Sequence, residues 1–239
     1  MGCFKDEEKM RAIYSPNHAL DENTTLVDKE SLHHLVNVLR VKAGEELLIL
    51  DGVGGKAHYH VQQITKEKVD LKRIKLEMAE RFHRISVLLG VPKKDYLEDV
   101  IRSCVQLGVN EIYLWESEYS QPKGRLKEDR LEKILRNSYE QSNNPYDLKI
   151  KNYNELDLDF FDHKIVMSVQ ESGDNKKVSG INLKLPTLIA IGPEGGFSTS
   201  EEESLIKEKG FLPLHLNTPI MKTTQAVPAG IGTLFGASL

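Results

Sequence analysis

The chain has 239 residues, of which 39% are hydrophobic and 28% are charged, and its formal net charge is -4. This composition is ordinary for a globular protein that can bury one or two cores. No apolar stretch approaches the roughly 20 residues that span a bilayer, and the charged start does not read as a signal peptide, so we expect a cytoplasmic protein without membrane contact. The negative net charge excludes indiscriminate attraction to polyanions, so an RNA partner would need a local basic patch.

Residues 11–76 are predicted to form short strands and one helix. The helix covers residues 31–40, where apolar residues recur at helical spacing after an N-cap-like Ser31. A strand, an Asp51-Gly52 turn and a second strand follow. The second strand alternates, with apolar positions at Ala57, Tyr59 and Val61. This pattern predicts a small β-sheet or β-barrel.

The polar residues of this first part give no strong functional signal. His58 and His60 share a strand face, but a zinc site needs at least three protein ligands and no third is evident, so we expect no metal. His33 and His34 are adjacent on the helix and point apart, and His34 is expected to fill the polar face. The stretch 66–84 is rich in cations, which fits either a basic patch or a solvated strand and linker.

The segment 77–84 has no clear periodicity and is the predicted domain boundary, which gives domains 1–76 and 77–239. Beyond it, apolar strands alternate with amphipathic helices, the pattern of an α/β fold with a parallel sheet. The predicted strands are 84–91, 111–115, 164–170, 187–192 and 211–217. The predicted helices are 93–108, 125–142, 198–210 and 226–239. Cys104 falls on the apolar face of the first of these helices and is expected to be a core residue.

The sequence Gly192-Pro193-Glu194-Gly195-Gly196 follows a predicted buried strand and precedes a helix whose start, Ser198 with Glu201, forms a capping box. Ligands of parallel sheets bind beyond the carboxyl ends of the strands, and glycines let a ligand approach the main chain. Glycine and proline also punctuate ordinary turns, so both readings stay open. The segment 216–224 after the last strand would end at the same edge, and the two loops could wall one pocket.

Taken in order, five stretches resemble the bacterial 16S ribosomal RNA uridine N3-methyltransferases of the SPOUT superfamily. They are "HHLVNVLRVKAGEELLILDGVGG", "VPKKDYLEDVIRSCVQLGVNEIY", "YEQSN", "LIAIGPEGGFSTSEEESL" and "LHLNTPIMKTTQAV". The resemblance implies a PUA-like β-barrel that holds RNA, followed by an α/β domain whose chain end forms a trefoil knot. It also implies a homodimer through the C-terminal domain, a 16S rRNA or small-subunit partner, and S-adenosylmethionine as cofactor. Family members begin near "MRAIYSPN", so residues 1–9 are expected to be an extension, a misplaced start or a remnant of cloning.

The same resemblance implies roles for individual residues. The cofactor pocket would be formed by Gly192, Pro193, Gly195, Gly196, Leu216, Asn217, Ile220 and Met221. Glu194 would lie at its mouth and either handle the uridine proton or position the substrate, or else cap nearby amides. Lys222 would stabilise the charge that develops on the uracil. The RNA backbone would be held by Arg40, Lys42 and Lys93.

The chain departs from the family pattern at several arginines. The final family stretch carries two arginines and a glutamate where this chain has Pro219, Lys222 and Thr224. The family's Pro-Lys-x-Asp-Arg ends here in Tyr96, and its "EQSGR" is altered at residues 143–144. Besides the uridine N3-methyltransferase, the sequence therefore leaves two alternatives. One is an RNA-binding or ribosome-assembly protein that has lost methyl transfer, and the other is a SPOUT enzyme with another RNA target.

Overall fold

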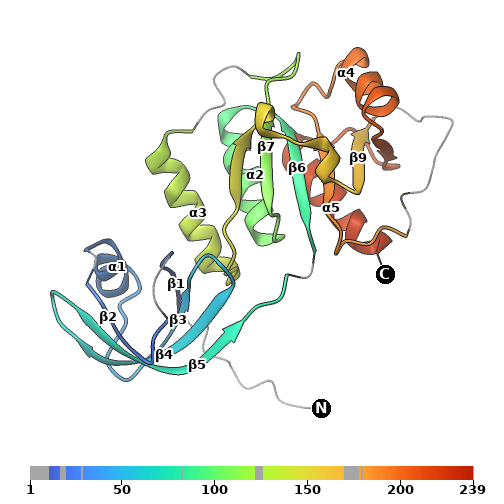
Figure 1. Cartoon of the computed structure of the whole chain (residues 1–239). Coiled ribbons are helices and arrows are strands. Elements are labelled where there is room, and N and C mark those ends of the chain that lie inside the picture. Colours follow the sequence, from blue (N-terminus) through green and yellow to red (C-terminus); the bar gives the residue numbers. More distant parts are fainter. Residues whose placement is uncertain are drawn as a thin grey trace, which may run out of the picture. The chain divides into compact units, whose positions relative to one another are not determined.

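The computed structural model describes residues 11–16, 20–27, 29–81, 83–121, 126–169, 178 and 180–238 (Figure 1). The expected N-terminal extension, residues 1–9, lies outside this part. The contacts divide the chain into two compact units. The first runs to Glu80 and includes Arg136–Asp147, and the second comprises Arg81–Leu135 and Leu148–Leu239.

The first unit is built on a five-stranded sheet in the order β1-β3-β4-β5-β2. Its strands are β1 (Arg11–Tyr14), β2 (Asn23–Leu26), β3 (Glu46–Leu50), β4 (Gly55–Ile64) and β5 (Val69–Met78). β1 and β3 are parallel, and the other neighbours are antiparallel. Ala57, Tyr59 and Val61 on β4 are fully buried, which confirms the alternation predicted from the sequence.

The predicted helix of this unit exists but begins earlier than expected. Helix α1 (Lys29–His33) continues into a π-helical turn, η1 (His34–Val38). Ser31 lies buried inside α1 instead of capping it, so its predicted role as the N-cap was wrong. The chain leaves the helix through Arg40, which has a positive φ of 52°.

His34 was predicted to fill the polar helix face, and that prediction was wrong. Its Nε2 lies 3.2 Å from Glu140 Oε2, on the part of helix α3 (Glu128–Ser142) that belongs to the first unit. The other Glu140 oxygen accepts the Tyr14 N–H at 3.1 Å. Burial raises the pKa of Glu140. The carboxyl group beside His34 comes from more than 100 positions further along the chain, and helix periodicity carries no signal for it.

The second unit contains a six-stranded sheet in the order β11-β9-β10-β6-β7-β8, in which all neighbours are parallel. Its strands are β6 (Ile85–Gly90), β7 (Glu111–Trp115), β8 (Lys149–Asn152), β9 (His163–Ser168), β10 (Thr187–Ile191) and β11 (Leu212–His215). The central strands β6 and β10 are buried throughout, as continuous apolar runs predict. The α/β class with a parallel sheet is thereby confirmed.

Four helices accompany this sheet. They are α2 (Lys94–Gln106), α3, α4 (Thr199–Glu203), which continues into the π-helical turn η4 (Ser204–Glu208), and α5 (Thr223–Ala237). Cys104 on α2 is fully buried, as predicted, and burial raises the pKa of its thiol. The capping box at Ser198 is present in both directions. In the described part of the chain, no helix has the length and apolar character needed to cross a membrane.

Candidate functional site

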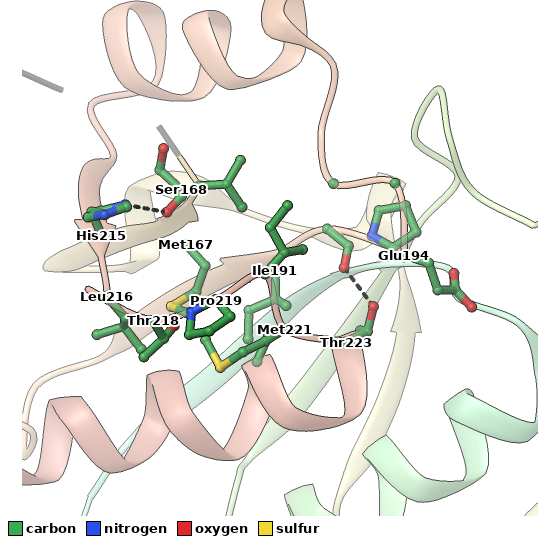
Figure 2. Close-up of a pocket in the computed structure, with 17 residues that line it drawn as sticks. Met167, Ser168, Ile191, Glu194, His215, Leu216, Thr218, Pro219, Met221 and Thr223 are labelled. Atoms are coloured by element: carbon green, nitrogen blue, oxygen red, sulfur yellow. Dashed lines mark hydrogen bonds between the residues drawn. The ribbon is translucent and has the colours of Figure 1, made fainter. Parts of the chain in front are cut away.

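A cavity of about 260 Å³ opens where three neighbouring strands of the second unit end (Figure 2). Its walls are the residues that follow β9, β10 and β11, together with the first turn of α5. This is the edge at which parallel sheets bind ligands, and the volume is near the lower end of the roughly 300–1,000 Å³ of small-molecule pockets. Glu194 and His215 lie on opposite sides of it in Figure 2.

The loop after β10 is both a tight turn and one wall of this cavity. The Gly196 N–H donates to the Pro193 carbonyl at 2.9 Å, and Gly196 has a positive φ of 74°, which favours glycine. A Cβ on Gly192 would lie 2.7 Å from the Gly196 carbonyl carbon. The glycines therefore serve the turn, and the turn places its main chain against the cavity.

Gly90 packs against this loop and was not predicted to do so. It is the last residue of β6, and a Cβ there would lie 2.4 Å from Pro193 Cδ. The only signal in the sequence is a glycine that ends an otherwise apolar strand.

The second wall is the segment after β11. The segment 216–224 was expected to wall the pocket, and residues 216 and 218–221 line the cavity. The predicted cofactor residue Asn217 does not. Thr223, at the start of α5, donates its hydroxyl to the Gly192 carbonyl at 3.2 Å (Figure 2). This bond ties the second wall to the first.

The structure brings eight predicted residues together at the cavity: Gly192, Pro193, Glu194, Gly195, Gly196, Leu216, Ile220 and Met221. The sequence analysis did not name Ser168 and His215, which close the far side, where His215 Nδ1 lies 3.3 Å from the Ser168 carbonyl. Their signal was their place at the carboxyl ends of two predicted strands.

Glu194 provides the one carboxylate of the lining. Its Oε1 accepts the Lys93 N–H at 3.0 Å, just before α2 begins. Its Oε2 is buried and meets no hydrogen-bond partner among the described residues. Lys93 thus contributes its main chain here, while the residue as a whole is exposed.

Lys222 lies outside the cavity lining, at the N-cap of α5. Its Nζ is 5.6 Å from the centre of the Tyr96 ring, in the first turn of α2, a distance at which a cation is attracted to an aromatic face. The other two predicted RNA contacts, Arg40 and Lys42, are exposed residues of the first unit, and the Lys42 N–H donates to Glu45 Oε2 at 3.0 Å.

The sequence matches the RNA methyltransferase domain over residues 79–234 and the RNA methyltransferase PUA domain over residues 27–72. This chain belongs to the RNA methyltransferase family. The family predicted from the five sequence stretches is thereby confirmed, as is the arrangement of a PUA domain followed by a methyltransferase domain.

Relatives of this RNA methyltransferase cover most of its length. The ribosomal RNA small subunit methyltransferase E of Bacillus subtilis is 29% identical, over 85% of this chain and 86% of its own. The ribosomal RNA small subunit methyltransferase E 2 of Borreliella burgdorferi is 30% identical, over 91% and 93%. Among solved structures, the Neisseria gonorrhoeae ribosomal RNA small subunit methyltransferase E bound to S-adenosyl methionine has the same fold, with a TM-score of 0.79, 23% identity and coverage of 95% and 97%.

Proposed function

We propose that this protein is an S-adenosylmethionine-dependent methyltransferase that acts on the N3 of a uridine in 16S ribosomal RNA. The observation that carries the proposal is the cavity between two segments of a member of the RNA methyltransferase family. One segment is residues 192–196 after β10, called the glycine loop below, and the other follows β11. Relatives that are 29% and 30% identical over most of their length are named for the small-subunit ribosomal RNA.

The lining suits this cofactor. It consists of main-chain groups of glycines and mostly apolar side chains, and no lysine or arginine occurs among the seventeen residues that form it. Such a site does not fit a phosphate group, which calls for cationic or anion-binding donors. S-adenosylmethionine carries a positive charge and no phosphate, and when bound it supplies an electrophilic methyl group.

The chain's own polar groups can serve the uridine. The N3 of neutral uracil carries a proton that must leave, and the uracil oxygens gain negative charge as it does so. Glu194 lines the cavity, and its Oε2, which has no hydrogen-bond partner among the described residues, is a suitable acceptor for that proton. Lys222 lies between the lining residues Met221 and Thr223 and would stabilise the charge on the uracil oxygens.

The finer features of the family follow as parts of this proposal. Residues 1–76 would form a PUA-like β-barrel that holds RNA with Arg40 and Lys42, and residues 77–239 would transfer the methyl group with Lys93 near the RNA. The bond between Thr223 and the Gly192 carbonyl supports a chain end tucked behind the loop after β10, as a trefoil knot requires. The proposal also includes a homodimer through the C-terminal domain and a cytoplasmic location.

Two measurements test the proposal. Isothermal titration calorimetry should detect S-adenosylmethionine binding, and no binding at millimolar cofactor would rule out the enzyme. Mass mapping of ribosomal RNA from a deletion strain should show the loss of one methyl group on a uridine of 16S RNA. An unchanged map, with cofactor binding intact, would favour a binding protein that has lost methyl transfer, and a loss elsewhere would identify another RNA target.

The role of Lys222 has its own test. Because Lys222 does not line the cavity, Lys222→Ala should leave the cofactor affinity unchanged while it lowers the rate of methyl transfer. An undiminished rate would remove Lys222 from the mechanism.

A further inference from the structure

The loop that follows β7 is held rigidly next to the glycine loop of the second unit. Within it, Ser120 accepts the Ser117 N–H at 2.9 Å and donates its hydroxyl to the Trp115 carbonyl at 3.1 Å. On one side, the Glu118 N–H donates to Glu201 Oε1 at 2.8 Å. On the other, the Gln121 N–H donates to the Val91 carbonyl at 3.0 Å. The described part of this loop therefore has a fixed main chain.

Tyr119 lies in the described part of this loop. Ser117 is buried, but 47% of Tyr119 is exposed. A Cβ on Gly195 would lie 3.0 Å from the Tyr119 Cβ and 3.3 Å from its Cγ. The tyrosine is therefore packed against the residue that directly follows Glu194, and the lack of a side chain at Gly195 makes this approach possible.

We propose that Tyr119 is the stacking platform for the uracil that enters beside Glu194, an inference that rests on the proposed function. An enzyme that modifies a base must take it out of its stack and hold it in a fixed orientation. RNA-binding proteins hold such bases on aromatic faces. Tyr119 is half-exposed, belongs to a hydrogen-bonded loop and packs against Gly195, the residue next to the proposed proton acceptor, and so meets these requirements.

The position relative to Glu194 gives the platform its specific use. The polar groups of a stacked base lie in the plane of the base, so they extend past the edge of the ring on which it stacks and stay available to neighbouring protein groups. Glu194 is the next residue to Gly195, and its Oε2 has no partner in the described structure. Stacking would thus set the face of the uracil while Glu194 receives its N3 edge.

The test uses purified full-length protein, labelled S-adenosylmethionine and small ribosomal subunits from the deletion strain. Tyr119→Ala should lower kcat/KM for the subunit about 5- to 150-fold, the range expected for the loss of one base–aromatic stack. Tyr119→Phe keeps the ring and should stay within about twofold of the wild type. The cofactor affinity, measured by calorimetry, should be the same in all three proteins, which separates stacking from a collapse of the cavity.

Phe160→Ala provides the matched control. Phe160 is 52% exposed and belongs to the short 3-10 helix η3 (Leu158–Phe160), which precedes β9. It is therefore at the amino-end edge of the parallel sheet, opposite the cavity. Its removal should leave kcat/KM unchanged.

Filter binding of the same subunits distinguishes failure of this inference from failure of the proposed function. If the wild type binds subunits but transfers no methyl group, the proposed function falls, and weaker binding by Tyr119→Ala still supports stacking. Equal binding and equal kcat/KM for Tyr119→Ala and the wild type would overturn the inference. A phenylalanine variant as impaired as the alanine variant would overturn it as well, because the ring alone should suffice.

Discussion

Substituting Gly90 by alanine should disturb the cofactor site from a position that does not line it. Gly90 is the last residue of β6 and packs against Pro193 of the glycine loop. An added Cβ would lie 2.4 Å from Pro193 Cδ, 2.9 Å from Pro193 N and 3.1 Å from Ser117 Oγ. Favourable contacts between carbon atoms occur at roughly 3.5–4.0 Å, so the overlap with Pro193 exceeds 1 Å. The proline ring is rigid, and the main chain of the loop has to move.

The magnitude of this effect can be bracketed. Over-packing of a buried site by a methyl group destabilises a protein by about 1–3 kcal/mol. In a chain of this size, each kcal/mol corresponds to roughly 2–4 °C in the melting temperature, so we expect Gly90→Ala to melt about 2–12 °C below the wild type. Displacement of Pro193 should also weaken S-adenosylmethionine binding, because the following residues line the cavity.

Calorimetry measures both quantities, and α5 offers a matched control. Gly232 is an exposed position of this helix, where an added Cβ meets nothing within 4 Å. Gly232→Ala should therefore stabilise the protein by about 0.5–1 kcal/mol without any change in cofactor affinity. If Gly90→Ala retains the melting temperature and cofactor affinity of the wild type, the glycine loop does not depend on Gly90 and the reasoning fails.

Three further predictions concern individual side chains. Glu194→Gln keeps an acceptor for the Lys93 N–H but removes the base, so kcat should fall by about 10²- to 10⁴-fold at unchanged cofactor affinity; full activity would reduce Glu194 to a capping role. Tyr96→Leu should lower kcat about two- to fivefold through loss of a cation–π contact worth about 0.5–1 kcal/mol, whereas Tyr96→Phe should not. Burial lowers the pKa of His83, so the unfolded chain takes up the proton first as the pH falls, and the free energy of unfolding should decline below about pH 6.5. His83→Gln can still donate a hydrogen bond to the Leu107 carbonyl. Urea unfolding at pH values from 5 to 7.5 should show a smaller decline of the free energy of unfolding for this variant than for the wild type. An equal decline would contradict the assignment of this pH dependence to His83.

The sequence was informative where burial acts on whole segments. Strands such as β6 and β10 are mostly apolar and buried throughout because both faces are covered, and α2 shows its buried face at helical spacing. Strand β8 (Lys149–Asn152) was not predicted. It pairs with only one neighbour, β7, and no residue in it is fully buried, so it carries neither an apolar run nor a clear alternation.

The candidate site divides in the same way. The glycine loop could be located from the sequence because a buried strand and a capping box bracket it. The contacts that hold the loop could not. Asn217 was expected to face the cavity together with its neighbours, yet it is exposed and outside the lining.

Two of the departures from the family pattern, Tyr96 and Lys222, are neighbours in the structure. The pattern places arginines at the positions of Tyr96 and Lys222, which are far apart in the chain. Here the Lys222 Nζ lies 5.6 Å from the Tyr96 ring centre. Two adjacent guanidinium groups would repel each other unless an anion lay between them, whereas a lysine over a tyrosine face attracts. The pair thus retains one positive charge beside the cavity and replaces the second with a group that orients it. In the proposed mechanism the retained charge would act on the uracil, so we expect the exchanges at positions 96 and 222 to weaken RNA binding more than the methyl-transfer step itself.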